Sequence, residues 1–449
     1  MAAVSNHQLE PPGAIRKIAQ RLEDAGHETW CVGGAVRDAL LGHGHLDWDL
    51  ATAATPKQVR RLFPRTVPVG IEFGTIGVLD DAGVMHEVTT FRRDVRTDGR
   101  HAEVEFGASL TEDLARRDFT VNAIAWSPTR HELSDPFGGR EDLQRRVIRA
   151  VGVPDERMRE DRLRALRGIR FAARFGFDIE PETWAAIVRS APHLGRLSAE
   201  RVKQELDKTM EQVARPSIAM EMWRRAGALG ALIPALEDAP RLAFASADEL
   251  TKPRGGPRND ERRTLRITAV FLELSERDAA STLRALRFSN RDVAWISGTI
   301  GAWHRVRDML ESSARGERRL GAAELRRIVA TAGRLRVRTI WRLLAARCAA
   351  ESRLKTGRAG RANGWGPIHS LYREALRVAF RGAAPLELAD LAVDGDDLRR
   401  AGVPPGPELG RMLHRLLDRV LEDPAGNTRE ALLGVVAELL ASGHGKEER

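Results

Sequence analysis

The stretch Cys31-Val-Gly-Gly-Ala-Val-Arg-Asp-Ala-Leu40, followed closely by Leu46-Asp-Trp-Asp-Leu50, decides the fold of this chain. Gly33 and Gly34 allow the backbone to turn tightly and to come close to a ligand. A helix that starts after this turn directs its unpaired N–H groups towards an anion. Arg37 lies in the first turn of that helix, where a cation is favourable only beside a bound anion. The stretch therefore predicts a phosphate-binding turn between a strand and a helix.

Asp47 and Asp49 alternate with the apolar residues Leu46, Trp48 and Leu50. A period of two is typical of a strand and places both carboxylates on one face. Carboxylates this close repel each other unless a cation lies between them, and Mg²⁺ commonly binds one or two carboxylates together with substrate phosphates. A Gly-Gly pair or an Asp-x-Asp motif alone is more often a surface turn or a pair of solvated aspartates. The two motifs together favour nucleotide chemistry, with Asp47 and Asp49 as metal ligands.

The same residues carry a family resemblance. Gly33-Gly-Ala-Val-Arg-Asp38 and Leu46-Asp-Trp-Asp-Leu-Ala-Thr52 resemble the signature of the polymerase-β-type nucleotidyltransferases. More narrowly, they resemble the class II group, which contains the tRNA CCA-adding enzymes and the bacterial poly(A) polymerases. The resemblance implies an α+β fold, in which a small mixed-sheet polymerase-β-like nucleotidyltransferase head is followed by an all-α neck, body and tail. It also implies a set of nucleotide-binding residues that begins in the glycine turn with Gly33, Gly34 and Arg37.

The composition narrows the classes of protein to consider. A chain of 449 residues is long for one core and suggests about two to four domains. The net charge of +9 indicates a polyanionic partner, and the aromatic content of 5% favours RNA binding through phosphates over extensive base stacking. The absence of a bilayer-spanning apolar run and of a secretory signal leads us to expect no membrane partner. The two cysteines, Cys31 and Cys348, lie far apart in the sequence, which favours a cytoplasmic protein.

A third carboxylate, Glu87, lies in the strand-like segment Met85–Phe91. Its place in the alternation brings it to the face of the metal ligands if the segment pairs with their strand. The alternative is a surface glutamate opposite a buried Val88. The family carries its third catalytic acid in a strand of this kind, so the resemblance implies that Glu87 is catalytic together with Asp47 and Asp49.

The segment Arg92–Gly107 is polar, charged and contains glycine, and by itself it predicts a mobile surface loop. The family has a flexible loop at this point, which is implicated in the switch from C to A addition. Its presence favours addition of the full CCA sequence over addition of CC alone.

The most specific motif is Asp113-Leu-Ala-Arg-Arg-Asp-Phe-Thr-Val-Asn-Ala123. The adjacent Arg116 and Arg117 suit a triphosphate, because guanidinium groups match phosphate oxygens in pairs. Asn122 can bond a ribose or a phosphate. The alternative is the end of a helix with a solvated arginine pair. The match to the family motif Arg-Arg-Asp-Phe-Thr-x-Asn-Ala is complete, and it implies that these side chains bind the nucleotide.

A second informative stretch, Glu160–Phe171, has a helical pattern. Asp161, Arg164 and Arg167 follow one another at intervals of three, so a helix places them on one side. A solvated Asp-Arg surface pair is the common alternative. The family carries Glu-Asp-x-x-Arg here, and its aspartate and arginine read the incoming base. The resemblance therefore assigns base reading to Asp161 and Arg164, and Arg167 and Arg170 complete the nucleotide-binding set.

From Pro154 the pattern is helical almost to the end of the chain. The motif Ser198–Leu206 resembles a family motif that braces the base-reading helix through Glu200, Arg201 and Glu205. The segment Ile267–Leu274 lacks the His-Asp pair of the phosphohydrolase modules that some relatives carry, so no such activity is expected. The turn Gly402–Gly410 either delivers a helix N-terminus to an RNA phosphate or simply packs. The predicted domains are a catalytic head (1–147), a nucleotide-selecting neck (148–215), a body (216–330) and a tRNA-binding tail (331–449).

The sequence thus predicts a Mg²⁺-dependent enzyme that adds C, C and A from CTP and ATP to the 3′ end of tRNA without a nucleic acid template. Its partners are tRNA, CTP and ATP. Alternatives within the class are a poly(A) polymerase or an enzyme that adds only CC or only A. An alternative outside the class is a catalytically inactive RNA-binding protein. The oligomeric state is left open.

Overall fold

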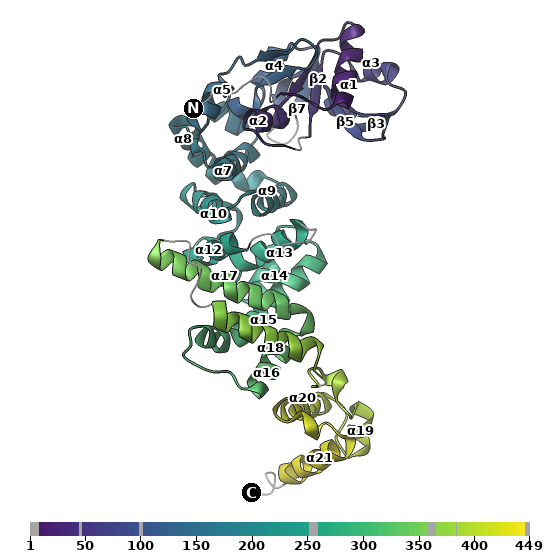
Figure 1. Cartoon of the computed structure of the whole chain (residues 1–449), viewed down its shortest axis with the longest axis vertical. Coiled ribbons are helices and arrows are strands. Elements are labelled where there is room, and N and C mark those ends of the chain that lie inside the picture. The colour runs from purple at the N-terminus through teal and green to yellow at the C-terminus, as the bar shows by residue number, and fades with distance from the viewer. Residues whose placement is uncertain are drawn as a thin grey trace. The chain divides into compact units, whose positions relative to one another are not determined.

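The computed structural model describes residues 9–44, 47–97, 102–250, 259–357, 365–382 and 384–444. The chain forms two compact units, residues 1–237 and residues 238–449. The first contains the β-sheet together with helices, whereas the described part of the second is helical (Figure 1). This arrangement confirms the predicted α+β class with a mixed-sheet head and a helical remainder. The finer division into head, neck, body and tail stays a prediction.

Within the described residues of the first unit, seven strands form one sheet in the order β3-β4-β5-β2-β1-β8-β9. β2 and β5 are parallel, and the other neighbouring strands are antiparallel, so the sheet is mixed as predicted. The strands are β1 Thr29–Val32, β2 Asp49–Thr52, β3 Thr66–Gly70, β4 Thr75–Leu79, β5 Met85–Thr90, β8 Ala125–Ser127 and β9 Glu132–Ser134. The predicted strand over Asp47–Asp49 therefore begins later, at its second aspartate.

One face of the sheet is covered by α1 (Gly13–Asp24) and α3 (Pro56–Leu62), which contact β1, β2, β4 and β5 (Figure 1). Both helices follow from their sequences. α1 turns its apolar stripe inwards and ends before Gly26, whose φ of 84° is the left-handed conformation that glycine favours. α3 begins with Thr55 as its cap and Pro56 in its first turn.

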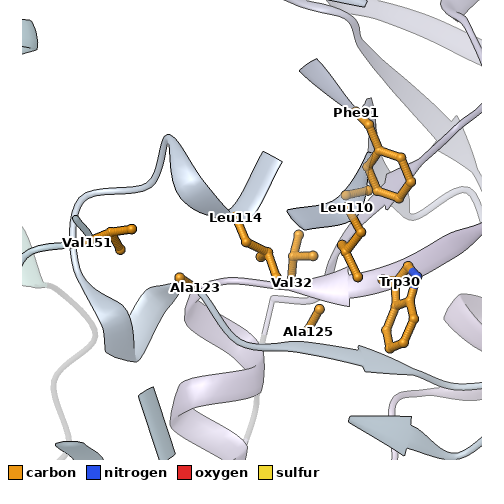
Figure 2. Packing of buried hydrophobic residues seen from close by; sticks show 9 residues of the cluster. Trp30, Val32, Phe91, Leu110, Leu114, Ala123, Ala125 and Val151 are labelled. Carbon is orange, nitrogen blue, oxygen red and sulfur yellow. The ribbon is translucent and has the colours of Figure 1, made fainter. Parts of the chain in front are cut away.

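The opposite face packs against α4 (Leu110–Ala115) and the segment that follows it. Figure 2 shows this apolar cluster close to the strands. Its buried residues are Trp30, Val32, Ala51, Phe91, Leu110, Leu114, Ala123, Ala125 and Val151. Side chains alternate between the two faces along a strand, so residues two positions apart lie on the same face. Asp49, at the start of β2, therefore lies on the same face as Ala51, which belongs to this cluster. The cluster therefore packs against β2 next to Asp49, the predicted metal ligand at the start of that strand.

The prediction of a loop over Arg92–Gly107 is wrong for the described residues. The segment forms a hairpin of β6 (Arg92–Thr97) and β7 (Ala102–Phe106). The charged residues of this segment led to the prediction of a solvated loop. Two of them instead form an ion pair across the hairpin, Arg93 Nη2 to Glu105 Oε2 at 2.8 Å. Residues 98–101, at the tip, lie outside the described part of the chain.

The helices after the sheet position the remaining predicted site residues. The single helix predicted over Glu160–Phe171 is wrong, because α6 ends at Glu160 and a new helix, α7, begins at Leu163. Asp161 lies between them in an extended conformation, and its Oδ1 accepts a hydrogen bond from the N–H of Leu163, the first residue of α7. The helices of this part are α2 Gly34–Leu40, α5 Gly139–Arg145, α6 Pro154–Glu160, α7 Leu163–Phe175, α8 Pro181–Ser190, α9 Ala199–Gln212, α10 Pro216–Arg225 and α11 Ala228–Leu232.

The described part of the second unit consists of helices around buried residues that include Trp303 and Trp341. A further apolar cluster joins α19, α20 and α21. The turn Gly402–Gly410 does deliver the N-terminus of α20, with positive φ at Gly402 and Gly406. The helices are α12 Arg241–Glu249, α13 Asn259–Val270, α14 Glu276–Ala285, α15 Asn290–Ala314, α16 Ala322–Ala332, α17 Val337–Thr356, α18 Trp365–Phe380, α19 Gly395–Arg400, α20 Pro407–Glu422 and α21 Arg429–His444. Across the described residues, no helix combines the length and the apolar character that crossing a membrane requires.

Candidate active site

A pocket of about 490 Å³ in the first unit brings together residues from the glycine turn, β2, the segment after α4, α7 and α9. Every residue that the sequence predicts to bind nucleotide lines it, as does Asp49. Asp47 and Glu87 are exposed side chains outside this lining. The lining residues are Gly33, Gly34, Arg37, Asp49, Arg116, Arg117, Asp118, Asn122, Asp161, Arg164, Arg167, Arg170, Phe171, Arg174, Lys208 and Gln212.

The glycine turn requires glycine at its first position. Gly33 has a φ of 77°, and a Cβ atom there would lie only 2.8 Å from Arg117 Nη1. The turn can therefore lie directly against the arginine that is predicted to bind triphosphate. Arg37 is buried beneath the turn, where its Nε donates to Asp38 Oδ1 at 2.7 Å and its Nη1 donates to Asn122 Oδ1. Arg37 is thus fixed in place by neighbours in the protein.

The three predicted catalytic carboxylates approach one another at one end of the sheet. Leu50 of β2 pairs in parallel with Val88 of β5, so the residues before them, Asp49 and Glu87, are neighbours on the same face. The pKa of Asp49 is raised to about 6, first by burial and then by the negative charges of Glu87 and Asp47, against an opposing effect of Arg117. The carboxylates therefore repel one another, which is the condition under which a cation binds.

Arg116 and Arg117 are held by a buried carboxylate. Asp113 accepts hydrogen bonds from Arg116 Nη2 at 2.7 Å and from Arg117 Nη2 at 3.1 Å. Burial acts to raise the pKa of Asp113, but the charges and hydrogen bonds of Arg117 and Arg116 outweigh it and hold that pKa below its usual range. The alternative of a solvated arginine pair is wrong, because both side chains are mostly buried and anchored. Their orientation is set before any ligand arrives.

Asp118 has the same role for a second pair of predicted residues. Its Oδ1 accepts from Asn122 Nδ2 at 2.8 Å and its Oδ2 accepts from Arg167 Nε at 2.9 Å. Burial acts to raise the pKa of Asp118, but Arg167 and Asn122 outweigh it and keep that pKa below its usual range. Asn122 is in turn bonded to Arg37, so one network runs from α2 to α7.

The Asp118–Arg167 pair makes a pH-dependent prediction. Asp118→Asn should destabilise the protein by about 3 kcal/mol at pH 7, because it leaves a largely buried arginine without its main partner. The wild-type carboxylate has a lowered folded-state pKa, so its contribution is complete above about pH 4 and is lost as the pH falls through that folded-state value. Urea unfolding at pH 7 and at acid pH should show that the difference in the free energy of unfolding between wild type and variant becomes smaller on acidification.

The exposed Asp155–Arg189 pair supplies the control. Its side chains are 41% and 54% exposed, so Asp155→Asn should change stability by less than about 1 kcal/mol. If the difference in the free energy of unfolding between wild type and Asp118→Asn stays constant from pH 7 to acid pH, the destabilisation is not electrostatic.

Asp161 and Arg164 are each held by protein groups and are not bonded to each other through their side chains. Asp161 Oδ2 accepts from Arg201 Nη2 at 2.8 Å. Arg164 Nη2 donates to the carbonyl oxygen of Arg116 at 2.8 Å, and its Nη1 donates to Glu160. Both side chains line the pocket, where the remaining oxygen lone pairs of Asp161 and N–H groups of Arg164 can meet a ligand.

α9 contacts Asp161 and α7 through Arg201 and Glu205, two of the three residues for which the family resemblance implied a bracing role. Besides the Arg201–Asp161 contact, the buried Glu205 accepts from Arg170 Nε at 2.7 Å. Arg170 Nη1 also donates to Gln212 Oε1 at 3.1 Å. Arg170, the third predicted arginine of α7, is therefore held in place by α9.

Comparison with known proteins places this site in a family. Residues 29–149 match the "Poly A polymerase head domain", residues 176–239 the "Probable RNA and SrmB- binding site of polymerase A", and residues 367–436 the "tRNA nucleotidyltransferase domain 2". The CCA-adding enzyme of Geobacillus kaustophilus is 34% identical over 423 residues, which are 92% of this chain and 94% of that enzyme. The chain belongs to the CCA-adding enzymes.

Solved structures of CCA-adding enzymes share its fold. The crystal structure of the Bacillus stearothermophilus CCA-adding enzyme in complex with CTP is 31% identical and has a TM-score of 0.72, over 96% of this chain and 98% of that one. The Thermotoga maritima CCA-adding enzyme complexed with tRNA is 21% identical and has a TM-score of 0.62, over 98% and 99% of the two chains, which shows the fold alone. The predicted membership of the class II nucleotidyltransferases is thereby confirmed.

The nucleotidyltransferases to which the CCA-adding enzymes belong depend on divalent metal ions, and the carboxylates of this chain fit such an ion. The fit rests on Asp49, whose pKa is raised first by burial and then by the negative charges of Glu87 and Asp47, since a cation would relieve that repulsion. Among the described residues, no three His, Cys, Asp or Glu side chains are close enough to hold a metal by themselves. Mg²⁺ commonly takes one or two carboxylates and completes its shell with substrate phosphates.

Six residues that line the pocket or hold its arginines escaped the sequence reasoning, namely Asp113, Asp118, Phe171, Arg174, Lys208 and Gln212. Two of them lay in the quoted Asp113–Ala123 motif. The spacing of Asp113 to Arg116 and Arg117, three and four residues, is the spacing of helical ion pairs and was a usable signal. Lys208 and Gln212 lie four residues apart on α9 and continue the face of Glu205. Nothing in the local sequence connects them to α7.

Proposed function

We propose that this chain adds C, C and A, from CTP and ATP, to the 3′ end of tRNA and releases pyrophosphate, without a nucleic acid template. The observation that carries the proposal is the single pocket in which Asp49, Arg117 and the Asp161–Arg164 pair meet. Such a pocket supplies a metal ligand, a phosphate ligand and a base-reading pair to one incoming nucleotide. Cytoplasmic localisation is part of the proposal.

In this proposal Asp47 and Asp49 hold Mg²⁺, and Glu87 is the third catalytic acid. Bound Mg²⁺ would lower the pKa of the attacking 3′-hydroxyl and neutralise charge on the phosphates. The triphosphate is bound by Arg117 and Arg116, which Asp113 already holds in position. Prepositioned guanidinium groups stabilise the charge that develops on the transferred phosphoryl group without a cost of reorganisation.

The base is read on its Watson–Crick edge by Asp161 and Arg164. Cytosine and adenine both present an exocyclic amine beside an unprotonated ring nitrogen, so an aspartate acceptor and an arginine donor fit both. Uracil and guanine would direct a carbonyl oxygen at the aspartate, which costs free energy and rejects them. The contacts of Asp161 with Arg201 and of Arg164 with the Arg116 carbonyl support a fixed spacing between the two side chains.

In the proposed domain organisation, residues 1–147 carry out catalysis and residues 148–215 select the nucleotide. Residues 216–330 would form the helical body, and residues 331–449 would form the tail that binds the tRNA. The test of the whole proposal is to incubate the pure protein with tRNA lacking CCA, with CTP and ATP together and each alone, and to sequence the product ends. Ends of CCA with both nucleotides support it. Long A tails would support the poly(A) polymerase alternative, which two of the family descriptions name.

Binding of tRNA is predicted to depend steeply on salt. The net charge of +9 and the few aromatic residues indicate that phosphate contacts supply most of the affinity. Each contact should lower log K by about 0.7 to 0.9 per unit of log salt concentration. Titrations of labelled tRNA at several KCl concentrations measure the slope, and an affinity that does not change with salt would contradict the prediction.

A further inference from the structure

The sheet face that carries Glu87 continues into an exposed apolar surface. Val67 of β3 pairs with Gly77 of β4, and Gly77 pairs with Glu87 of β5, so these positions form one row across three strands. Met85 lies two residues before Glu87 and therefore on the same face. Val67, Val69 and Met85 are 38%, 44% and 43% exposed. We call Val67, Val69, Gly77 and Met85 the β3–β5 platform.

Gly77 allows the surface to be continuous. A Cβ atom at Gly77 would lie 2.6 Å from Met85 Sδ and 3.0 Å from Val69 Cγ2. The side chains of Met85 and Val69 therefore extend over the glycine from either side and cover it. The result is an apolar surface in place of the separate side chains that usually project from adjacent strands.

The location of the platform relates it to the reaction. In the strand order β3-β4-β5-β2-β1, the platform covers β3, β4 and the start of β5. Glu87 follows on β5, and Asp49 on β2 and the glycine turn after β1 lie beyond it. The pocket residues occupy the β2 and β1 side. In an in-line displacement, the attacking oxygen approaches the α-phosphate from the side opposite the leaving pyrophosphate. The nucleoside that carries the attacking hydroxyl must therefore lie on the Glu87 side, where the platform begins.

We propose that the β3–β5 platform binds the 3′-terminal nucleobase of the acceptor RNA by stacking, and this inference rests on the proposed function. The identity of the terminal base changes with every addition, so its binding site has to tolerate any base. An apolar surface does so, because every base presents a π-face and no hydrogen-bond pattern is read. Met85 adds an adaptable, polarisable contact. An exposed apolar patch of this kind beside a charged site is typical of a binding surface.

The test is the double variant Val69→Ala/Met85→Ala. Its kcat/KM for tRNA lacking CCA should fall about fivefold or more through a higher KM for the RNA, while the KM for CTP stays unchanged. Both positions are exposed, so the melting temperature should not change. Val188→Ala in α8 is the matched control, since Val188 is 39% exposed and lies outside the platform. Met85→Leu alone should retain most of the activity.

An acceptor with an abasic 3′-terminal ribose separates stacking from a structural effect. Wild type should lose about the same factor on this acceptor, and the double variant should lose little more. Equal losses of the variant on both acceptors, or no loss at all, would overturn the inference. A change of oligomeric state without a change in RNA kinetics would also overturn it and would assign the platform to contacts between copies of the chain. If wild type extends no tRNA, the proposed function fails first, and the inference fails with it.

Discussion

Asp49→Ala is expected to reduce the rate of nucleotide transfer by at least about 10³-fold. The substitution removes a predicted ligand of the metal ion, and a bound metal ion stabilises the charge of the transition state by several kcal/mol. Asp49 is the predicted metal ligand that also lines the pocket. The structure adds an expectation for stability. Burial and the charges of Glu87 and Asp47 raise the pKa of Asp49 to about 6, so the ionised carboxylate is unfavourable in the metal-free protein at neutral pH. Its removal should leave the melting temperature unchanged or slightly higher.

Single-turnover incorporation of CMP and thermal melts in EDTA measure the two effects. Asp81→Ala is the matched control, because the Asp81 side chain is 96% exposed and lies outside the pocket. It should change neither quantity. A near-normal kcat in Asp49→Ala would reject the metal assignment, whereas a large fall in melting temperature would show that the carboxylate is structural.

Arg164→Ala is expected to weaken base discrimination. The variant loses the donor to cytosine N3 or adenine N1, whereas Asp161 still accepts from the exocyclic amine. A lost hydrogen bond in a buried site costs about 1 to 3 kcal/mol, so the preference for CTP and ATP over UTP and GTP should fall about 5- to 150-fold. The measurement is kcat/KM for all four nucleotides on the same RNA.

The structure also shows how this second prediction could fail. Arg164 donates to the carbonyl of Arg116, so its loss can disturb the triphosphate site as well. That disturbance would lower kcat/KM for all four nucleotides by one common factor, and it would mean that the residue is structural. Arg189→Ala, which removes an arginine on the surface of α8, controls for loss of positive charge and should leave all four values unchanged.

The sequence predicted the parts of the site that are local in the chain. The Gly-Gly turn and the capped start of α3 each depend on neighbouring residues, and the structure has both, whereas the strand predicted from the alternation over Asp47–Asp49 begins only at Asp49. The resemblance supplied Glu87, whose place beside Asp49 depends on the parallel pairing of β2 with β5 and could not be derived from either segment alone.

The failures have a common physical cause, which is that charged side chains found partners far away in the sequence. The segment after Arg92 has the composition of a loop, but Arg93 pairs with Glu105 across a hairpin. Asp161 lies where the predicted helix is interrupted, and its side chain accepts from the Leu163 N–H and from Arg201, 40 residues later. Asp118 reaches Arg167 at a separation of 49 residues. Periodicity within a window cannot detect such pairs.

Asp38 has a consequence for the way one enzyme can accept bases of two sizes. It accepts hydrogen bonds from Arg37 of α2 and from Arg174 of α7, 136 residues later. In the proposed function, α2 contributes to phosphate binding and α7 to base reading, so Asp38 joins the two helices that contact opposite ends of the nucleotide. A purine reaches further from its sugar than a pyrimidine, so under the proposed function we expect the extra length to be accommodated at the other end of α7. That end is Asp161, where the chain is extended between two helices.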